Sequence, residues 1–274
     1  MISENMAELD APYEVAPEDL AAFQRDGHVL CRNVLASDVV ARIRPQIVEA
    51  AYERNNEARP LEDRDTYGKA FLQMENLWRT HPAVRSFVFS QRFGAIAARL
   101  LGVDAVRIYH DQALFKEPGG GPTPWHQDQV YWPLDGDRTV TMWMPLVDIP
   151  EQVGSMTFAS GSHRIPRAAD VVISDESEEQ FDRFVAEHEL QLTTYGAMSA
   201  GDATFHAGWT IHRAGANPGR TMREVMTVIY FADGMRAIEP DRPERANDLR
   251  NWLGGVEPGQ LAASERNPIV GRAR

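Results

Sequence analysis

Several features are scarce in this sequence, and each scarcity excludes a class of protein. The 274 residues include one cysteine, Cys31, which cannot form an internal disulfide and has no partner at metal-site spacing. A reducing, cytoplasmic compartment is therefore expected. No apolar run approaches the ~18 residues of a membrane span, and Met1–Asp10 lacks the basic-then-apolar order of a signal peptide. Basic side chains number 28 against 40 acidic ones, and this net charge of −12 argues against binding nucleic acid or an anionic membrane.

Lysine is rarer still, because Lys69 and Lys116 are the only two in the sequence and the remaining basic residues are arginine. Such a bias is typical of a GC-rich coding sequence. Hydrophobic residues make up 43% of the chain, and a domain of this length can bury roughly 70–75% of its unfolded surface. The chain therefore needs no disulfide to form a stable core.

Helical patterns come first along the chain, and short strand patterns follow. Residues 1–16 are polar and acidic and predict a loose arm, whereas 55–72 predict a loop or a mobile cover. Turn-forming residues separate the later, β-branched runs, which indicates a sandwich or barrel. The expected helices are 17–26, 37–53, 81–101 and, as an insertion, 176–188; the expected strands are 106–115, 140–147, 155–159, 190–195, 203–206 and 222–231.

The predicted fold class is α+β with a mainly β core. Neither a repeat nor a low-complexity linker divides the chain, so one domain over 1–274 is expected. Its parts would be the arm at 1–16, mostly helical support over 17–101, the β core over 102–235 and a C-terminal extension over 236–274.

The first pattern that points to chemistry is His126-Gln127-Asp128. Alternate residues of a strand face the same side, so this pair aims an imidazole and a carboxylate at one point. A third ligand would come from a distant strand, and His206 and His212 both qualify by position. Two histidines and one carboxylate form the facial triad that holds Fe(II) in non-haem oxygenases. A hydrogen-bonded polar pair without metal is the alternative.

Arg223 is the second such feature, because it lies among apolar residues of a predicted strand. A buried guanidinium needs an anionic partner. Its neighbour Glu224 would point to the opposite face of the strand. The partner is therefore either another carboxylate of the protein or the carboxylate of a bound ligand, and the local sequence leaves both open.

Taken together, the motifs resemble those of the phytanoyl-CoA dioxygenase family of Fe(II)/2-oxoglutarate-dependent oxygenases. The resemblance begins at Phe23–Val29 and covers roughly residues 17 to 235. It rests on the ordered set Gly119, His126-Gln127-Asp128, Gly154-Ser155-Met156, Ser160-Gly161-Ser162-His163, Gly201-Asp202, His212, Asn217 and Arg223.

The resemblance implies a double-stranded β-helix (jelly-roll, cupin-like) core and a non-haem dioxygenase that uses Fe(II), 2-oxoglutarate and O2. It assigns the catalytic metal to His126, Asp128 and His212, which leaves His206 a supporting role. By the same comparison Arg223 binds the far carboxylate of 2-oxoglutarate. Three more residues take positions that contact or flank this cosubstrate in the family, although a solvated lysine and core packing are the plain alternatives: Lys116, Gln127 and Trp143.

The implied reaction begins with removal of hydrogen from a C–H bond of a small molecule and ends in hydroxylation, cyclisation, epimerisation or desaturation. Asp128 is present, so the halogenating variant of the site is not expected. Aromatic and polar residues near the motifs suggest a pocket for a polycyclic or aromatic substrate, as in a tailoring step of bacterial secondary metabolism, including antibiotic biosynthesis. The candidate contacts, each of which could equally be core, are Trp78, Gln73, Tyr131, Trp132 and Phe158.

Three alternatives differ in what they require. A fatty acyl-CoA 2-hydroxylase would need a basic surface for the CoA phosphates, and the arginine groups near the C-terminus are interleaved with acids. A metal hydrolase or isomerase would need neither Arg223 nor 2-oxoglutarate. A catalytically silent binding protein would not need the intact triad. Succinate formation separates the oxygenase from the last two.

Overall fold

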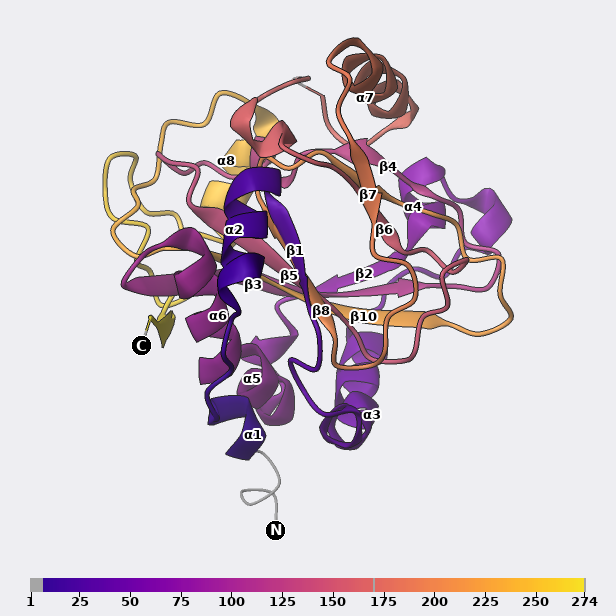
Figure 1. Ribbon diagram of the computed structural model, residues 1–274, viewed down its shortest axis with the longest axis horizontal. Coiled ribbons are helices and arrows are strands. Elements are labelled where there is room, and N and C mark those ends of the chain that lie inside the picture. Colours follow the sequence, from indigo (N-terminus) through magenta and orange to yellow (C-terminus); the bar gives the residue numbers. More distant parts are fainter. Residues whose placement is uncertain (1–6, 170, 274) are drawn as a thin grey trace.

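The computed structural model describes residues 7–169 and 171–273, and the first six residues of the expected arm lie outside this range. Within the described residues, seven strands form the larger of two sheets, in the order β1-β8-β5-β10-β3-β11, with β2 also paired to β3 (Figure 1). These strands are β1 His28–Cys31, β2 Leu72–Glu75, β3 Ala105–Lys116, β5 Thr139–Pro145, β8 Ala203–Ala207, β10 Arg223–Ala232 and β11 Ile269–Arg272.

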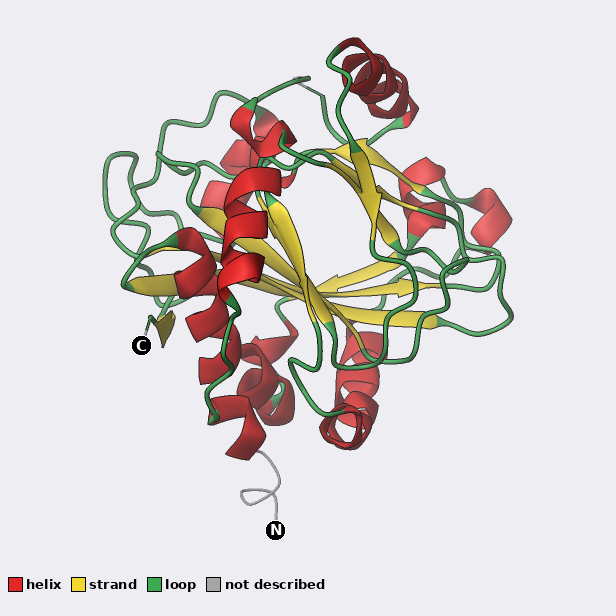
Figure 2. Cartoon of the chain, in the orientation of Figure 1, coloured by secondary structure: helices red, strands yellow, loops and turns green. Residues whose placement is uncertain are grey.

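The smaller sheet has the order β4-β9-β6-β7, and the strand pairs of both sheets are antiparallel. It contains β4 Thr123–His126, β6 Met156–Ala159, β7 Leu192–Thr194 and β9 His212–Ala214. Figure 2 shows this sheet facing one side of the larger sheet, with helices packed on the other side. The arrangement is a double-stranded β-helix with supporting helices, which confirms the expected fold class.

Helices cover the outer face of the larger sheet, and this covering explains the composition of its central strands. Every residue of β10 and of β5 is buried, because one face packs on the helices and the other faces the interior. The helices of the described chain are α1 Ala7–Asp10, α2 Pro17–Asp26, α3 Ser37–Arg54, α4 Thr66–Ala70, α5 Pro82–Val88, α6 Gln91–Leu101, α7 Asp175–Glu187 and α8 Pro243–Asn251. Of these, α4 and α7 lie against β4 of the smaller sheet instead.

One helix expected over 81–101 is two helices in the structure, α5 and α6. The break lies at Phe89 and Ser90, where the Ser90 hydroxyl accepts a hydrogen bond from the backbone N–H of Phe93 and so begins a new helix. Helix α3 begins without a side-chain cap, because Ala36 holds the N-cap position. Apolar periodicity continues through the break, so it could not locate the boundary.

Segments expected to be loose carry structure. Residues 66–70 form α4, whose N-terminal N–H groups are capped by Asp65 through a 2.7 Å bond from Gly68. At the other end of the chain, β11 pairs with β3 and lies against α6. A Cβ on Gly271 would lie 2.1 Å from the backbone of Gly94, so this close approach requires glycine. No helix in the part of the chain that the structure describes is both long and apolar enough to cross a membrane.

Candidate metal centre and active-site cavity

His126, Asp128 and His212 meet at the end of the smaller sheet. Strand β4 ends at His126 and pairs with β9 so that His126 lies opposite His212, which brings the two imidazole centroids to 4.0 Å. The expectation that Asp128 shares the strand with His126 is wrong, because Asp128 begins a short 3-10 turn, Asp128–Val130. That turn still brings the carboxylate to the imidazoles, and one ligand atom from each residue lies within 4.8 Å of the others.

Backbone carbonyls fix which nitrogen of each histidine faces the cluster. Nδ1 of His126 lies 2.8 Å from the Pro124 carbonyl oxygen, and Nδ1 of His212 lies 2.9 Å from that of Thr210. A carbonyl can only accept, so each Nδ1 carries the proton and each Nε2 presents a lone pair. Orientation of a ligand histidine by a second hydrogen bond is typical of metal sites. His206 differs, because its buried Nδ1 has no partner among the described residues.

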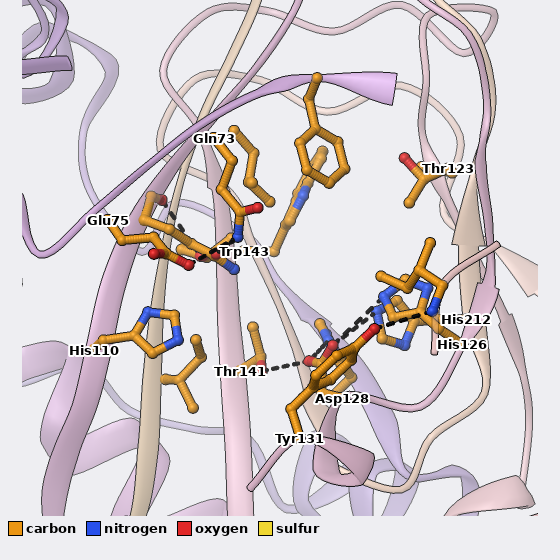
Figure 3. A pocket seen from close by; sticks show the side chains of 18 of the residues that line it. Gln73, Glu75, His110, Thr123, His126, Asp128, Tyr131, Thr141, Trp143 and His212 are labelled. Carbon is orange, nitrogen blue, oxygen red and sulfur yellow. Dashed lines mark hydrogen bonds and ion pairs between the residues drawn. The ribbon is translucent and has the colours of Figure 1, made fainter. Parts of the chain in front are cut away.

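The two oxygens of Asp128 have separate neighbours. Oδ1 lies 3.5 Å from Nε2 of His126 and 3.7 Å from Nε2 of His212. Oδ2 instead accepts a 2.9 Å hydrogen bond from the Thr141 hydroxyl and lies 3.3 Å from Nε2 of His206. The carboxylate is therefore held through one oxygen and offers the other to the cluster (Figure 3).

The protonation states suit a cation. Burial opposes ionisation of Asp128, but the imidazoles of His212, His126 and His206 outweigh burial and hold its pKa well below the usual range. Burial, followed by the neighbouring imidazoles, pushes the pKa of His212 well below its ordinary value. An ionised carboxylate beside a neutral imidazole is the form that binds a divalent metal.

Arg223 begins β10 and enters the same cavity as the triad. It is 2% exposed, its guanidinium lies 5.4 Å from the ring centre of Trp143, and Nη1 donates a 2.9 Å bond to the carbonyl of Gly154. Its buried Nε has no partner, and no carboxylate in the described ranges forms an ion pair with it. Burial lowers the pKa of Arg223 to about 9. Glu224 points away and binds Arg44 at 2.5 and 2.7 Å. These contacts leave Arg223 available for an anionic ligand.

A cavity of about 400 Å³ contains these groups, a size that suits a small organic ligand. Five predicted side chains line it together with the triad: Arg223, Trp143, Gln73, Tyr131 and Trp132. Figure 3 shows Gln73 across the cavity from His126 and His212. The structure therefore brings most of the expected site residues together.

Lys116 and Gln127 are not among the residues that line the cavity. Lys116 is fully buried and its ammonium donates to the carbonyl of Gly121, while burial, aided by Arg223, lowers its pKa to about 6. The Gln127 amide donates to the Trp209 carbonyl at 2.6 Å and accepts from Ala168 at 3.1 Å. Both side chains hold loops beside the site.

Trp78 and Phe158, offered as substrate contacts, also lie outside the cavity lining. Trp78 packs edge-on against Phe89, with 5.0 Å between ring centroids, in the core beneath the larger sheet. Phe158 is fully buried and stacks on His28 at 4.5 Å, with the His206 ring 5.6 Å away. Phe158 therefore supports the imidazoles from behind, and a core role replaces the expected contact at both positions.

Sequence reasoning missed several residues of the cavity wall. Thr141 and Thr227 come from central strands, while Glu75 follows Gln73 at the two-residue spacing that places both on one face of β2. That spacing was a usable signal. Other lining residues that were missed include Tyr67, His110, Gln112, Glu244, Asp248 and Trp252.

Comparison with known families gives a match over most of the chain. The sequence pattern of the family described as "Phytanoyl-CoA dioxygenase (PhyH)" matches residues 23–225. A "Probable alpha-ketoglutarate-dependent hypophosphite dioxygenase" of Stutzerimonas stutzeri is 26% identical over 170 residues, 60% of this chain and 58% of that protein. An "Ectoine dioxygenase" of Nocardia farcinica (strain IFM 10152) is 26% identical over 162 residues, 55% and 52% of the two chains. The match thus spans just over half the length of these curated relatives.

Solved structures extend the likeness to nearly the whole fold. The "non-heme alpha ketoglutarate dependent carbocyclase SnoK from nogalamycin biosynthesis" superposes with a TM-score of 0.77 at 24% identity, covering 95% of this chain and 99% of the other. The "epimerase SnoN" from the same biosynthesis superposes with a TM-score of 0.73 at 25% identity, covering 93% of this chain and 98% of the other. The first likeness establishes the fold that the sheet topology already indicates.

Proposed function

Because the chain belongs to the phytanoyl-CoA dioxygenase family of Fe(II)/2-oxoglutarate-dependent oxygenases, we propose that it is such an oxygenase acting on a small molecule. The metal ligands would be His126, Asp128 and His212, and Arg223 would bind 2-oxoglutarate. One observation carries the proposal: three ligand atoms within 4.8 Å share a cavity with a buried arginine that lacks an anionic partner in the described chain.

The residues present fit the metal and the cosubstrate. Two lone-pair Nε2 atoms and one carboxylate oxygen are the donor set of a facial triad. The orphaned Nε of Arg223 supplies a place for a carboxylate, and a bidentate carboxylate would satisfy this fork. Gly154 keeps the space beside Arg223 open, because a Cβ there would lie 2.9 Å from Nη1.

The protein's contribution to the reaction is geometric. When bound, Fe(II), 2-oxoglutarate and O2 together supply the oxidising power that removes a hydrogen atom from a substrate C–H bond. His126 and His212 keep their Nε2 atoms aimed at one point through bonds to backbone carbonyls. Thr141 and His206 hold one oxygen of Asp128. Arg223 orients the cosubstrate, with Trp143 against the guanidinium excluding water.

The proposed biological setting is a tailoring step in bacterial secondary metabolism. Tyr131, Trp132 and Trp252 give the cavity an aromatic wall suited to a ring-containing substrate. The structural neighbours from nogalamycin biosynthesis, a carbocyclase and an epimerase, support cyclisation or epimerisation beside hydroxylation as the outcome. A fatty acyl-CoA is disfavoured, because the described lining adds carboxylates rather than a cluster of cations.

The oxygenase is tested by loading the anaerobic protein with Fe(II) and then 2-oxoglutarate. We expect a visible absorption band, and after admission of O2 one succinate for each 2-oxoglutarate consumed. Asp128→Ala should lose both signals, whereas Asp137→Ala, a matched change at an exposed aspartate, should keep them. Metal-dependent turnover without 2-oxoglutarate would favour a hydrolase or isomerase. A folded protein that binds neither Fe(II) nor 2-oxoglutarate would be a silent binding protein.

A further inference from the structure

Acidic side chains gather in the part of the cavity that the metal and cosubstrate do not use. Glu75 comes from β2, while Glu244 and Asp248 come from α8, one turn apart. His110 of β3 lies beside them. Figure 3 shows Glu75 and His110 across the cavity from His126 and His212. We call this group of four residues the acidic end of the cavity.

Within the described chain the carboxylates of the acidic end have no directly paired cation, although the charge of Arg54 partly offsets the effect of burial on the pKa of Glu75. Neither Glu75, Glu244 nor Asp248 forms an ion pair there. Neither arginine of the lining pairs with them, since Arg213 binds Glu178 at 2.7 Å and Arg223 lies beside Gly154 and Trp143, at the position proposed for the cosubstrate. Burying carboxylates without a counter-charge is costly, so a cation brought by a ligand would offset that cost.

Protein donors satisfy only part of this group. Oε1 of Glu75 accepts a 3.1 Å bond from the Gln73 amide, and Oδ2 of Asp248 accepts a 2.7 Å bond from the Tyr109 hydroxyl. Oε2 of Glu75 has no partner among the described residues. Burial raises the pKa of Glu75 and raises that of Asp248 to about 7, with Glu75 adding to the effect on Asp248. Burial thus disfavours ionisation of both carboxylates, and Glu75 adds to that effect on Asp248, so a bound cation would favour their charged forms.

His110 is an independent sign of a ligand at this place. Its side chain is 6% exposed and faces the cavity (Figure 3). Nδ1 lies 3.3 Å from the carbonyl oxygen of Asp111 and therefore carries the proton, which leaves Nε2 as an acceptor without a partner among the described residues. Burial lowers the pKa of His110 to about 4, so the ring is neutral. An unused acceptor that opens into the cavity beside Glu75 favours a ligand that donates hydrogen bonds.

Aromatic rings complete the surroundings. Trp252 lies over His110 with 5.2 Å between ring centroids, and Trp132 contacts the same wall through Tyr109 at 5.4 Å. The face of a tryptophan attracts a cation within about 6 Å of its centre. Carboxylates, a neutral acceptor and an indole face together match an ammonium group better than a hydroxyl or an anion.

We propose that the acidic end of the cavity binds a protonated amine of the substrate, through Glu75, Asp248 and His110. The amine-bearing end of the substrate would then lie across the cavity from the triad, with the reacting carbon between them. This inference rests on the proposed oxygenase function in one respect, namely that the bound amine belongs to a substrate. Binding of the amine itself needs neither iron nor turnover.

The test compares a cation with its neutral isostere. Two preparations of the protein are used, one loaded anaerobically with Fe(II) and 2-oxoglutarate and one free of metal. Each is titrated with 2-phenylethylammonium and with 2-phenylethanol, and binding is followed by ligand-detected NMR. We expect the ammonium to bind at least tenfold more tightly. Glu75→Gln keeps an acceptor for Gln73 but removes the charge, so it should abolish most of this preference. Glu62→Gln, at an exposed glutamate, is the matched control.

A second variant guards against misfolding of the first. Asp248→Asn keeps an acceptor for Tyr109 and should reduce the same preference. Equal affinity of the two probes for the wild-type protein, or a preference that survives in both variants, overturns the amine site. Succinate formation without a preference for the ammonium probe would rule out the amine site and leave the oxygenase proposal standing. An ammonium preference in a protein that binds no iron removes only the oxygenase proposal.

Discussion

Nε2 of His206 lies 3.3 Å from Oδ2 of Asp128, on the side of the carboxylate away from Oδ1, the oxygen that the other two imidazoles approach. Two histidines near one carboxylate both looked like possible third ligands by position in the sequence. Their geometry separates them, because His212 belongs to the group that can share a metal and His206 contacts the opposite oxygen. His206 is therefore a positioning residue for Asp128.

The separation predicts different outcomes for two alanine variants. His212→Ala should lose Fe(II) binding, whereas His206→Ala should keep it with affinity lowered about 10–100-fold, the usual effect of removing a residue that orients a ligand. Thr141→Val removes the other bond to Oδ2 and should fall in the same range. Anaerobic competition with a chelator measures all three affinities. Loss of binding in His206→Ala together with retention in His212→Ala would reverse the ligand assignment.

Substitution of Arg223 should lower the affinity for 2-oxoglutarate and leave the affinity for Fe(II) unchanged. Hydrogen bonds to charged groups contribute about 1.5–3 kcal/mol, so Arg223→Ala should weaken 2-oxoglutarate binding about 10–100-fold. Fe(II) affinity should be unchanged, since Arg223 contacts Gly154 and Trp143 rather than the triad. Titration of the visible band of the Fe(II) protein with 2-oxoglutarate gives the affinity, and Arg220→Ala, at an exposed arginine, is the matched control. An unchanged affinity in Arg223→Ala would place the cosubstrate elsewhere.

Residues that meet through strand pairing were predictable from the sequence. The order of motifs gave the triad, and an arginine in an apolar strand gave Arg223. Lys116 shows the limit of this reasoning, because it lies opposite Arg223 on the paired strand but its ammonium turns to the Gly121 carbonyl. The direction of a long side chain depends on partners that the local sequence does not specify.

The acidic end of the cavity could not be predicted from the sequence, for a more specific reason. Ile108 faces the core beneath the helices, so strict alternation along β3 would place His110 on that same face. The register between β3 and β10 shifts there, with His110 opposite Ile229 but Ile108 opposite Tyr230, and this bulge turns His110 into the cavity. Asp248 then arrives from a helix far along the chain. Neither event has a marker in the sequence.

Asp111 should make the stability of the fold depend on pH. Its Oδ2 accepts a 3.0 Å bond from Leu77, its buried Oδ1 has no partner in the described chain, and burial raises its pKa from 3.8 to about 7. Between these values the folded protein keeps a proton that the unfolded chain releases, so the free energy of unfolding falls as pH rises through this window. The carboxyl thus contributes stability below about pH 4 that is lost by about pH 7.

Asp111→Asn removes this titration. We expect the variant to be more stable than the wild type at pH 8, by an amount of order a few kcal/mol at most, with the difference disappearing near pH 4. Urea unfolding at several pH values measures it, and Asp137→Asn at an exposed site provides the comparison. Identical pH dependence of Asp111→Asn and the wild type would show that the carboxyl ionises freely in the fold.

Gly154 lies beside Arg223 at the proposed cosubstrate pocket, and a matched pair of glycine variants can separate its effect on the backbone from its effect on Arg223. Its φ is +58°, a conformation that an L side chain adopts at a cost of about 1 kcal/mol, and an added Cβ would lie 2.9 Å from Nη1 of Arg223. Gly196 has a similar φ of +69° with no atom within 4 Å of the position of its Cβ. Both alanine variants should therefore lose similar stability for the backbone.

Only Gly154→Ala should displace the guanidinium as well. We expect 2-oxoglutarate binding to weaken severalfold in Gly154→Ala and to remain unchanged in Gly196→Ala, since Arg223 also donates a hydrogen bond to the Gly154 carbonyl. Thermal unfolding gives the shared backbone cost, and titration of the Fe(II) protein with 2-oxoglutarate gives the difference. Equal affinities in the two variants would mean that the guanidinium moves aside freely, and its place against Gly154 would then have no part in holding the cosubstrate.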